Sequence, residues 1–301
     1  GDTPMTGQPI TEAALRGAHA EYERPRVAEL EATLDMIARQ SRAVDIEVPT
    51  DSNSLRFGLI GDTHLGSLYE ATDQLRAFYR TCADAGIRII LHAGDVLDGH
   101  RIYKGQEYEL HKIGWEAQSD WFAEVAPGKD EGITTYFIAG NHDASFKKAA
   151  GMNVGRELQA RRPDWIHIGA DYGRVELRTA DGRPWRVLLV HPDGGTPYAI
   201  SYRAQNIIRD LEGGSKPHMV AIGHLHKSML MPSIRNLATY QVGCFQRQTP
   251  YMVRKPTAAH VGGWIISVTP GTSESLCNQI ESRFIAFYSE AVGCEEVIAT
   301  C

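Results

Sequence analysis

The chain has 301 residues, of which 43% are hydrophobic and 23% are charged, as is ordinary for a soluble globular protein. Its net charge of −6 argues against a protein that coats duplex DNA by charge alone, although bound divalent cations would reverse the charge locally. It has no apolar run long enough to cross a bilayer and no signal-peptide pattern at the N-terminus, so the sequence predicts a cytoplasmic protein without membrane contact.

Residues 1–50 are rich in Ala, Glu and Arg. Apolar residues recur there at helical spacing, as at Leu30, Leu34 and Ile37. The segment therefore predicts an amphipathic helical extension without catalytic chemistry. We expect it to pack on one following domain, residues 51–301.

From Leu55 the pattern changes to short apolar runs that end in small or polar residues. The runs are LRFGLIGD (55–62), IRIILHAGD (87–95), TTYFIAGNHD (134–143), RVLLVHPDGG (186–195) and HMVAIGHLH (218–226). Helix-like stretches lie between several of them, among them residues 71–85 and 199–211. This alternation predicts an α/β fold with a mostly parallel sheet and polar side chains gathered at the strand ends.

After His226 the chain becomes rich in strand-forming residues. The runs are RNLATYQVG (235–243), VGGWIISV (261–268) and RFIAFYS (283–289). They predict further antiparallel strands that complete a second sheet.

Polar side chains end all five earlier runs, and they are Asp62, His64, Asp95, Asp98, Asn141, His142, Asp143, His191, His224 and His226. Carboxylates, imidazoles and an amide that converge in this way repel and desolvate one another unless a cation holds them. Oxygen and imidazole donors without a thiolate suit Mn²⁺, Fe or Zn²⁺, and the five cysteines form no CxxC pair. There are too many ligands for one ion, which predicts two divalent cations about 3.5–4 Å apart, with a carboxylate such as Asp95 between them.

The motifs GDTH (61–64), GDVLD (94–98), GNHD (140–143), the strand-end His191 and GHLH (223–226) resemble, in order and spacing, those of the calcineurin-like metallophosphoesterases. The resemblance extends from residue 55 to about residue 268. It implies a four-layer α/β/β/α sandwich of two mixed sheets, to which this chain adds an N-terminal helix.

The resemblance also implies a role for each motif residue. Asp62, His64 and His226 would hold the first metal, Asn141, His191 and His224 the second, and Asp95 would bridge them. His142 would stabilise the transition state and protonate the leaving oxygen, with Asp98 fixing its ring, and Asp143 would order the turn. Mn²⁺ is the first candidate metal, with Fe, Zn²⁺ and Ni²⁺ as alternatives.

Two departures bear on the substrate. The serine/threonine protein phosphatases of this family carry Arg where this chain has Gly99 and Ala139. The segments AGDVLDG, GNHD and IGHLHKS are closer to those of SbcD-type DNA repair exonuclease subunits and of small bacterial or phage phosphodiesterases. We therefore predict a phosphodiesterase or nuclease that uses a metal-bridging hydroxide. A phosphomonoesterase and a non-catalytic scaffold stay open as alternatives.

Three loops follow the motifs and mix aromatic with basic residues, at residues 100–112, 192–205 and 244–255. This combination is typical of proteins that stack bases and contact phosphates of single-stranded nucleic acid. The sequence thus keeps DNA or RNA as candidate substrates, with Tyr198, Tyr202, Arg203 and Arg247 as candidate contacts. It leaves the oligomeric state open.

Overall fold

The computed structural model describes residues 44–47, 52–195, 197–211, 216–272 and 278–287. Most of the predicted helical extension, residues 1–43, lies outside this described part. Its last described piece, Val44–Glu47, is strand β1 and not helix, which corrects the expected boundary. The reason is a strand-like alternation, since Ile46 is buried against the core while Asp45 is exposed.

Two mixed six-stranded sheets form the centre of the domain. The strands after β1 are β2 (Leu55–Ile60), β3 (Ile89–His92), β4 (Thr134–Ile138), β5 (Trp165–Gly169), β6 (Tyr172–Arg178), β7 (Pro184–Val190), β8 (Met219–Ile222), β9 (Ser228–Ile234), β10 (Leu237–Val242), β11 (Gly262–Thr269) and β12 (Gln279–Ala286). The first sheet has the order β1-β6-β7-β8-β10-β9, and the second has the order β12-β11-β2-β3-β4-β5.

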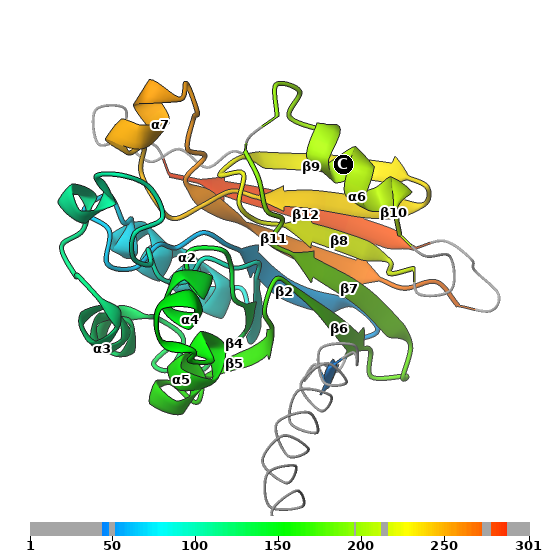
Figure 1. Ribbon diagram of the computed structural model, residues 1–301. Coiled ribbons are helices and arrows are strands. Elements are labelled where there is room, and N and C mark those ends of the chain that lie inside the picture. The colour runs from blue at the N-terminus through cyan, green and yellow to red at the C-terminus, as the bar shows by residue number, and fades with distance from the viewer. Residues whose placement is uncertain (1–43, 48–51, 196, 212–215, 273–277, 288–301) are drawn as a thin grey trace, which may run out of the picture. The chain divides into compact units, whose positions relative to one another are not determined.

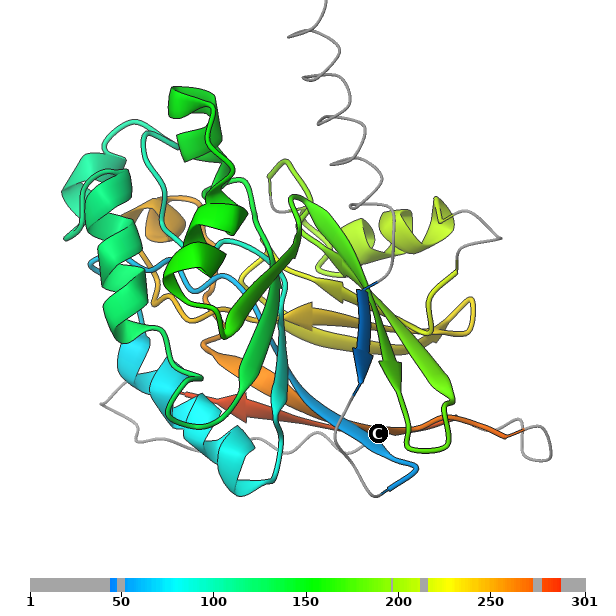
Figure 2. The ribbon, with the colours of Figure 1, turned by 90° about the horizontal axis from the view of Figure 1, so that it is seen from below.

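Helices cover the outer face of each sheet (Figure 1). The described helices are α2 (Thr72–Asp84), α3 (Trp115–Val125), α4 (Ala144–Ala150), α5 (Val154–Arg161), α6 (Tyr202–Arg209) and α7 (Pro250–Arg254), with a 3₁₀ turn, η1 (Gln106–Glu109), and α7 lies beyond the strand ends and not over a sheet. Helices α2, α3 and α5 bury apolar side chains against the second sheet, and α6 does so against the first. Figure 2 shows α6 on the opposite side of the two sheets from α2, α3 and α5.

Apolar side chains of both sheets meet between them in a third core cluster, which includes Phe57, Leu91, Leu189 and Tyr240. The order of layers is therefore helix, sheet, sheet, helix, which confirms the expected four-layer sandwich. Among the described helices, none combines the length and apolar character needed to span a membrane.

The five predicted runs with polar ends are strands β2, β3, β4, β7 and β8, and the two predicted helices are α2 and α6. The runs divide between the sheets, because β2, β3 and β4 pair in parallel in the second and β7 and β8 pair in parallel in the first. Parallel strands deliver their carboxyl ends to one edge, so both sheets contribute polar loops to the same region.

The strands after His226 correct one expectation. They do not complete a single sheet: β9 and β10 extend the first sheet, while β11 and β12 extend the second. Strand β10 is antiparallel to β9 but parallel to β8. Strand β9 was not expected, and it contains Pro232, which an edge strand tolerates because it needs no ladder bond on its free side.

Candidate functional site

The loops after β2 and β3 run side by side and remain hydrogen-bonded beyond the strands. The backbone N–H of Asp62 donates to the carbonyl of Gly94 (2.8 Å), and that of His64 donates to the carbonyl of Asp95 (3.1 Å). A bridge between Leu65 and Leu97 continues the pairing. This backbone ladder fixes the two loops relative to each other.

Left-handed backbone conformations concentrate in these loops. Among the described residues other than glycine, eight have positive φ, and five of them are predicted metal ligands: Asp62 (52°), His64 (46°), Asp95 (55°), His224 (73°) and His226 (53°). Each costs about 1–2 kcal/mol and persists only where the surrounding structure enforces it. Strained backbone conformations occur most often at functional sites. The strain in these loops therefore marks the side chains that they carry as candidate functional residues.

One side-chain cluster joins the first and last motifs. Asp62, His64 and His226 are buried, and each offers a ligand atom within 4.8 Å of the others. The Nε2 atoms of His64 and His226 lie 3.0 Å apart, and Oδ1 of Asp62 lies 3.4 Å from Nε2 of His226. The backbone N–H of His224 donates to both oxygens of Asp62 and fixes that carboxylate.

A second cluster contains Asp95, His191 and His224. Oδ1 of Asn141 joins it at 3.1 Å from Nε2 of His191 and 2.8 Å from Nδ1 of His224. Oδ2 of Asp95 lies 3.0 Å from Nε2 of His191 and 3.8 Å from Nε2 of His64. The Asp95 carboxylate thus lies between the two clusters.

The tautomers make this donor set suitable for cations. Nδ1 of His64 lies 3.0 Å from Oδ1 of Asp98, and Nδ1 of His191 lies 2.8 Å from the carbonyl oxygen of Ala93. Both partners are acceptors, so each Nδ1 carries a proton, and the Nε2 lone pair is available to a cation whenever that ring is neutral. Lone pairs that face carboxylates in a buried site require a positive charge between them.

A proton supplies that charge in the chain alone. Burial opposes the charged form of His191, but the carboxylates of Asp95 and Asp62 outweigh it and raise the pKa of His191 to about 9. His64, by contrast, has a lowered pKa because it is buried and near His142. The cluster therefore offers oxygen and imidazole donors, and their chemistry fits divalent cations.

His142 faces the same region from the loop after β4. The ring Nδ1 of His142 donates to the backbone carbonyl of Asp98 at 2.6 Å, and the backbone N–H of His142 donates to Oδ1 of Asp95 at 2.9 Å. The Asp98 carboxylate bonds to His64 instead. Asp98 thus contacts the His142 ring through its backbone carbonyl and not through its carboxylate.

Two buried glutamines complete the surroundings of Asp98, and no sequence motif points to either. Nε2 of Gln106 donates to Oδ2 of Asp98 at 2.9 Å, and Nε2 of Gln246 donates to Oδ1 at 3.0 Å. Both residues lie in segments that mix aromatic with basic residues, Gln106 in 100–112 and Gln246 in 244–255. A single glutamine carries no motif, so the sequence offers no signal for its partner.

Asp143 ties two motif loops together, as expected of a residue that orders the turn. Its carboxylate accepts the backbone N–H groups of Val96, Leu97 and Gly140 at 2.9–3.0 Å. Burial and the nearby Asp95 charge raise the pKa of Asp143 to about 7. The neighbouring Gly140 has no room for a side chain, because a Cβ there would lie 2.1 Å from Oδ1 of Asp95.

A cavity of about 470 Å³ opens over these residues, and His64, Asp95, Asp98, Asn141, His142 and His224 are among its lining side chains. None of the four predicted nucleic-acid contacts is among its lining residues. Tyr198 and Tyr202 are exposed, and Arg203 donates to the carbonyl of Gly195, which does line the cavity. Arg247 lines a separate cavity.

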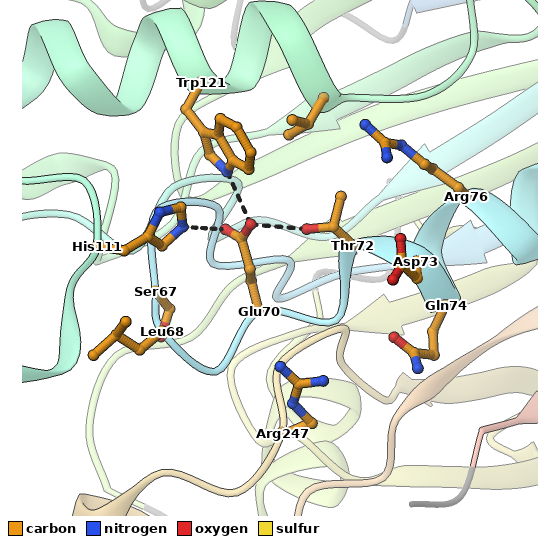
Figure 3. Close-up of a pocket in the computed structure, with 11 residues that line it drawn as sticks. Ser67, Leu68, Glu70, Thr72, Asp73, Gln74, Arg76, His111, Trp121 and Arg247 are labelled. Carbon is orange, nitrogen blue, oxygen red and sulfur yellow. Dashed lines mark hydrogen bonds and ion pairs between the residues drawn. The ribbon is translucent and has the colours of Figure 1, made fainter. Parts of the chain in front are cut away.

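That second cavity, of about 350 Å³, lies beside the loop after β2 (Figure 3). Figure 3 shows Glu70 at its centre, where the carboxylate accepts from Trp121 Nε1 (2.8 Å) and Thr72 Oγ1 (2.9 Å). Glu70 also accepts the backbone N–H of Gly66 (2.6 Å) and pairs with His111 (3.3 Å). Because Gly66 follows His64 by two residues, Glu70 supports the loop that carries this histidine.

Known proteins resemble this chain at different levels. The DNA polymerase II small subunit of two strains of Halobacterium salinarum is 35% identical over 98 residues, which are 32% of this chain. The match spans only 19% of the length of those relatives.

Among solved structures, a conserved uncharacterised protein from Streptococcus pneumoniae is 10% identical, with a TM-score of 0.37 and coverage of 77% of this chain and 90% of that one. GAP50, the anchor in the inner membrane complex of Plasmodium, is also 10% identical, with a TM-score of 0.44 and coverage of 82% and 90%.

The family comparison covers the motif-bearing strands. The family model described as calcineurin-like phosphoesterase matches residues 55–228, which contain all five motifs and both donor clusters. The match confirms the resemblance expected from the motifs. The chain belongs to the calcineurin-like phosphoesterase family.

Proposed function

We propose that the chain is a binuclear metal-dependent phosphodiesterase of nuclease type. Membership of the family implies divalent metal ions. We assign one ion to Asp62, His64 and His226, the other to Asn141, His191 and His224, and Asp95 to both. Mn²⁺ is our first candidate, with Fe, Zn²⁺ and Ni²⁺ as alternatives, because the donors are oxygens and imidazoles. Two such ions, when bound, neutralise phosphate charge and activate water.

The arrangement of His142 carries the proposal. Its Nδ1 carries a proton, because the Asp98 carbonyl can only accept. Its ring lines the cavity, and within the described part of the chain its Nε2 has no hydrogen-bond partner. Once Nε2 has taken up a proton from solvent, the ring can deliver that proton to a leaving oxygen and return to its neutral form with Nδ1 still protonated. An alkoxide leaving group needs such a proton, as in the cleavage of a diester.

The cavity suits a diester better than a monoester dianion. Among the described residues that line it there is no arginine, and Lys255 is the one lysine. Gly99 could not be replaced by the arginine found in protein phosphatases without moving the loop, because a Cβ at its φ of 77° would lie 2.4 Å from the carbonyl oxygen of His142. A diester carries one negative charge per phosphate, which needs fewer cationic partners.

The test is hydrolysis of bis(p-nitrophenyl) phosphate and of p-nitrophenyl phosphate with Mn²⁺. We expect the diester to be the better substrate and EDTA to abolish turnover. His142→Ala should keep its Mn²⁺, measured by elemental analysis, and lose about 10²–10⁴ of kcat on a dinucleotide, whose alkoxide leaving group needs a proton, but much less on the p-nitrophenyl esters, whose phenolate leaves without one. His218→Ala is the matched control, since His218 lies at the opposite end of β8 from His224 and His226. Full activity in EDTA would overturn the proposal.

Nucleic acid is our first candidate substrate. Support comes from the partial similarity to a protein named as a DNA polymerase subunit. A panel with Mn²⁺ tests it: single- and double-stranded DNA, RNA, cyclic nucleotides, a phosphopeptide and a chromogenic diester. Degradation of DNA or RNA would support the nuclease, whereas cleavage of small diesters alone would contradict that part of the proposal.

A further inference from the structure

One wall of the large cavity is built by residues that no motif includes. Ile102 and Tyr103 come from the loop before η1, and Tyr251, Met252 and Lys255 come from α7 and the residue after it. The other lining side chains include the candidate metal ligands and His142. A substrate whose phosphate reaches His142 therefore has this wall within the same cavity.

The wall is held rigid by its own contacts. The rings of Tyr103 and Tyr251 are stacked, with centroids 4.5 Å apart and planes inclined by 20°. The Tyr103 hydroxyl donates to Oε2 of the buried Glu109 at 2.8 Å. Helix α7 is capped by Thr249, whose side chain accepts the N–H of Met252. A preordered aromatic surface loses little entropy when a ligand binds to it.

The same two loops are also tied to the metal region. Gln106, three residues after Tyr103, and Gln246, five residues before Tyr251, both donate to the Asp98 carboxylate. Asp98 in turn contacts His64 and His142. The contacts of these two buried glutamine amides with Asp98 thus fix the position of the aromatic wall relative to the candidate catalytic groups.

The chemistry of the wall selects one kind of ligand. Tyr251 stacks on Tyr103 yet stays 37% exposed, so part of its ring is free for a ligand. Lys255 is exposed and forms no ion pair with the described residues. A flat ring attached to an anion matches an aromatic surface beside one free cation.

We infer that Tyr103, Tyr251 and Lys255 form a nucleoside subsite. The base of the nucleotide that carries the scissile phosphate stacks on the tyrosine pair, and Lys255 pairs with its phosphate. The inference rests on the proposed function in that it assigns the substrate class of the same cavity.

The first measurement is a preference ratio with Mn²⁺. It compares kcat/KM for thymidine 5′-(p-nitrophenyl phosphate) with kcat/KM for methyl p-nitrophenyl phosphate, which share a leaving group and differ only in the nucleoside. We expect a ratio of about ten or more, which Tyr251→Leu lowers about tenfold and Tyr251→Phe preserves. Tyr108→Leu is the control, because Tyr108 is exposed on η1 and does not line the cavity.

The second measurement is binding of thymidine 5′-monophosphate by calorimetry, which needs no turnover. Wild type should bind, Tyr251→Leu should bind about tenfold more weakly, and Lys255→Met should lose most of the salt dependence. Hydrolysis of both esters with a ratio unmoved by Tyr251→Leu would overturn the subsite and leave the phosphodiesterase standing. Binding with the expected variant pattern but without hydrolysis would support the subsite and overturn the phosphodiesterase. Absence of nucleotide binding by wild type would overturn the subsite.

Discussion

Asp98 contacts both kinds of candidate functional residue through different atoms. Its carboxylate accepts from His64, Gln106 and Gln246, and its backbone carbonyl accepts from His142. One residue thus holds a candidate ligand and the candidate proton donor in defined tautomers. The position of Asp98 three residues after Asp95 does not predict this double contact.

Asp98→Asn tests the contact to His64. The new amide places an N–H₂ group among His64, Gln106 and Gln246, which all donate hydrogen bonds to Asp98. Two donors then face each other, and the tautomer of the His64 ring is no longer fixed. We expect Mn²⁺ affinity, measured by calorimetry, to fall about 10–100-fold. Asp193→Asn is the control, since Asp193 is an exposed carboxylate in the loop after His191. Equal affinity in wild type and Asp98→Asn would contradict the assignment of His64 as a ligand oriented by Asp98.

His92 is a buried histidine outside the predicted ligand set. Its Nδ1 accepts the N–H of Gly94 at 3.2 Å and its Nε2 lies 3.1 Å from Oγ1 of Thr63, so the neutral ring satisfies both partners. Burial lowers the pKa of His92 to about 3. The unfolded chain takes up a proton near pH 6.5 and the folded chain does not until about pH 3, so acid favours unfolding in this interval.

His92→Gln should therefore flatten the acid side of the stability profile. Between about pH 5.5 and pH 4.5, wild type should lose about 1.4 kcal/mol of unfolding free energy per pH unit more than the variant, with a shallower difference nearer pH 6.5. Urea unfolding in EDTA at several pH values measures this, because the metal-free ligand groups are common to both proteins. Parallel profiles would contradict the proposed neutral state of His92.

At the scale of elements, the loop after β2 depends on a carboxylate outside every motif. Glu70 joins this loop to α3 through Trp121 and to the start of α2 through Thr72 (Figure 3). Its Gly66 contact lies two residues from His64. The loop that carries two candidate ligands is therefore supported from the second cavity.

Glu70→Gln should destabilise the domain. One oxygen becomes an N–H₂ group that faces hydrogen-bond donors, which costs about 2 kcal/mol for a partly buried charged acceptor. For a domain of this size a midpoint shift of several degrees follows, roughly 2–4 °C per kcal/mol, and thermal unfolding measures it. Asp73→Asn is the control, because the Asp73 carboxylate lines the same cavity but has no hydrogen-bond or ion-pair partner among the described residues. If both variants melt alike, the role assigned to Glu70 is wrong.

Local sequence patterns predict that a segment is a strand, but they do not predict the sheet to which it belongs. The five apolar runs were correctly predicted as strands because β-branched runs that end in Gly or Asp are a local signal. The sheet to which β10, β11 and β12 belong was not predictable in the same way. A run such as VGGWIISV reads alike in either sheet, and only its pairing with β2, some 200 residues earlier, decides its place.

For the whole molecule, the buried carboxylates at the edge of both sheets set the dependence on metal. Asp62 and Asp95 lie among imidazoles with almost no solvent contact. Cations that bind the folded chain and not the unfolded one stabilise it by mass action, by about 2.7 kcal/mol at a hundredfold excess over Kd.

Removal of metal with EDTA should therefore lower the unfolding midpoint by several degrees, and added Mn²⁺ should restore it. Thermal unfolding with and without Mn²⁺ measures the difference. His226→Ala should show a smaller Mn²⁺ effect, because it removes a proposed ligand. A midpoint that does not respond to Mn²⁺ in wild type would contradict a metal site at these clusters.

The sequence by itself determined the strands with polar ends, the family and the residue types of the candidate site, because these are encoded in short local patterns. Only the tertiary structure decided which loops become neighbours. In the folded chain Gln106 and Gln246 donate to Asp98, Tyr103 stacks on Tyr251, and Arg247 lines the second cavity instead of the candidate site. These contacts bring together loops far apart in the chain, so their partners follow from the packing of two sheets and not from any spacing in the sequence.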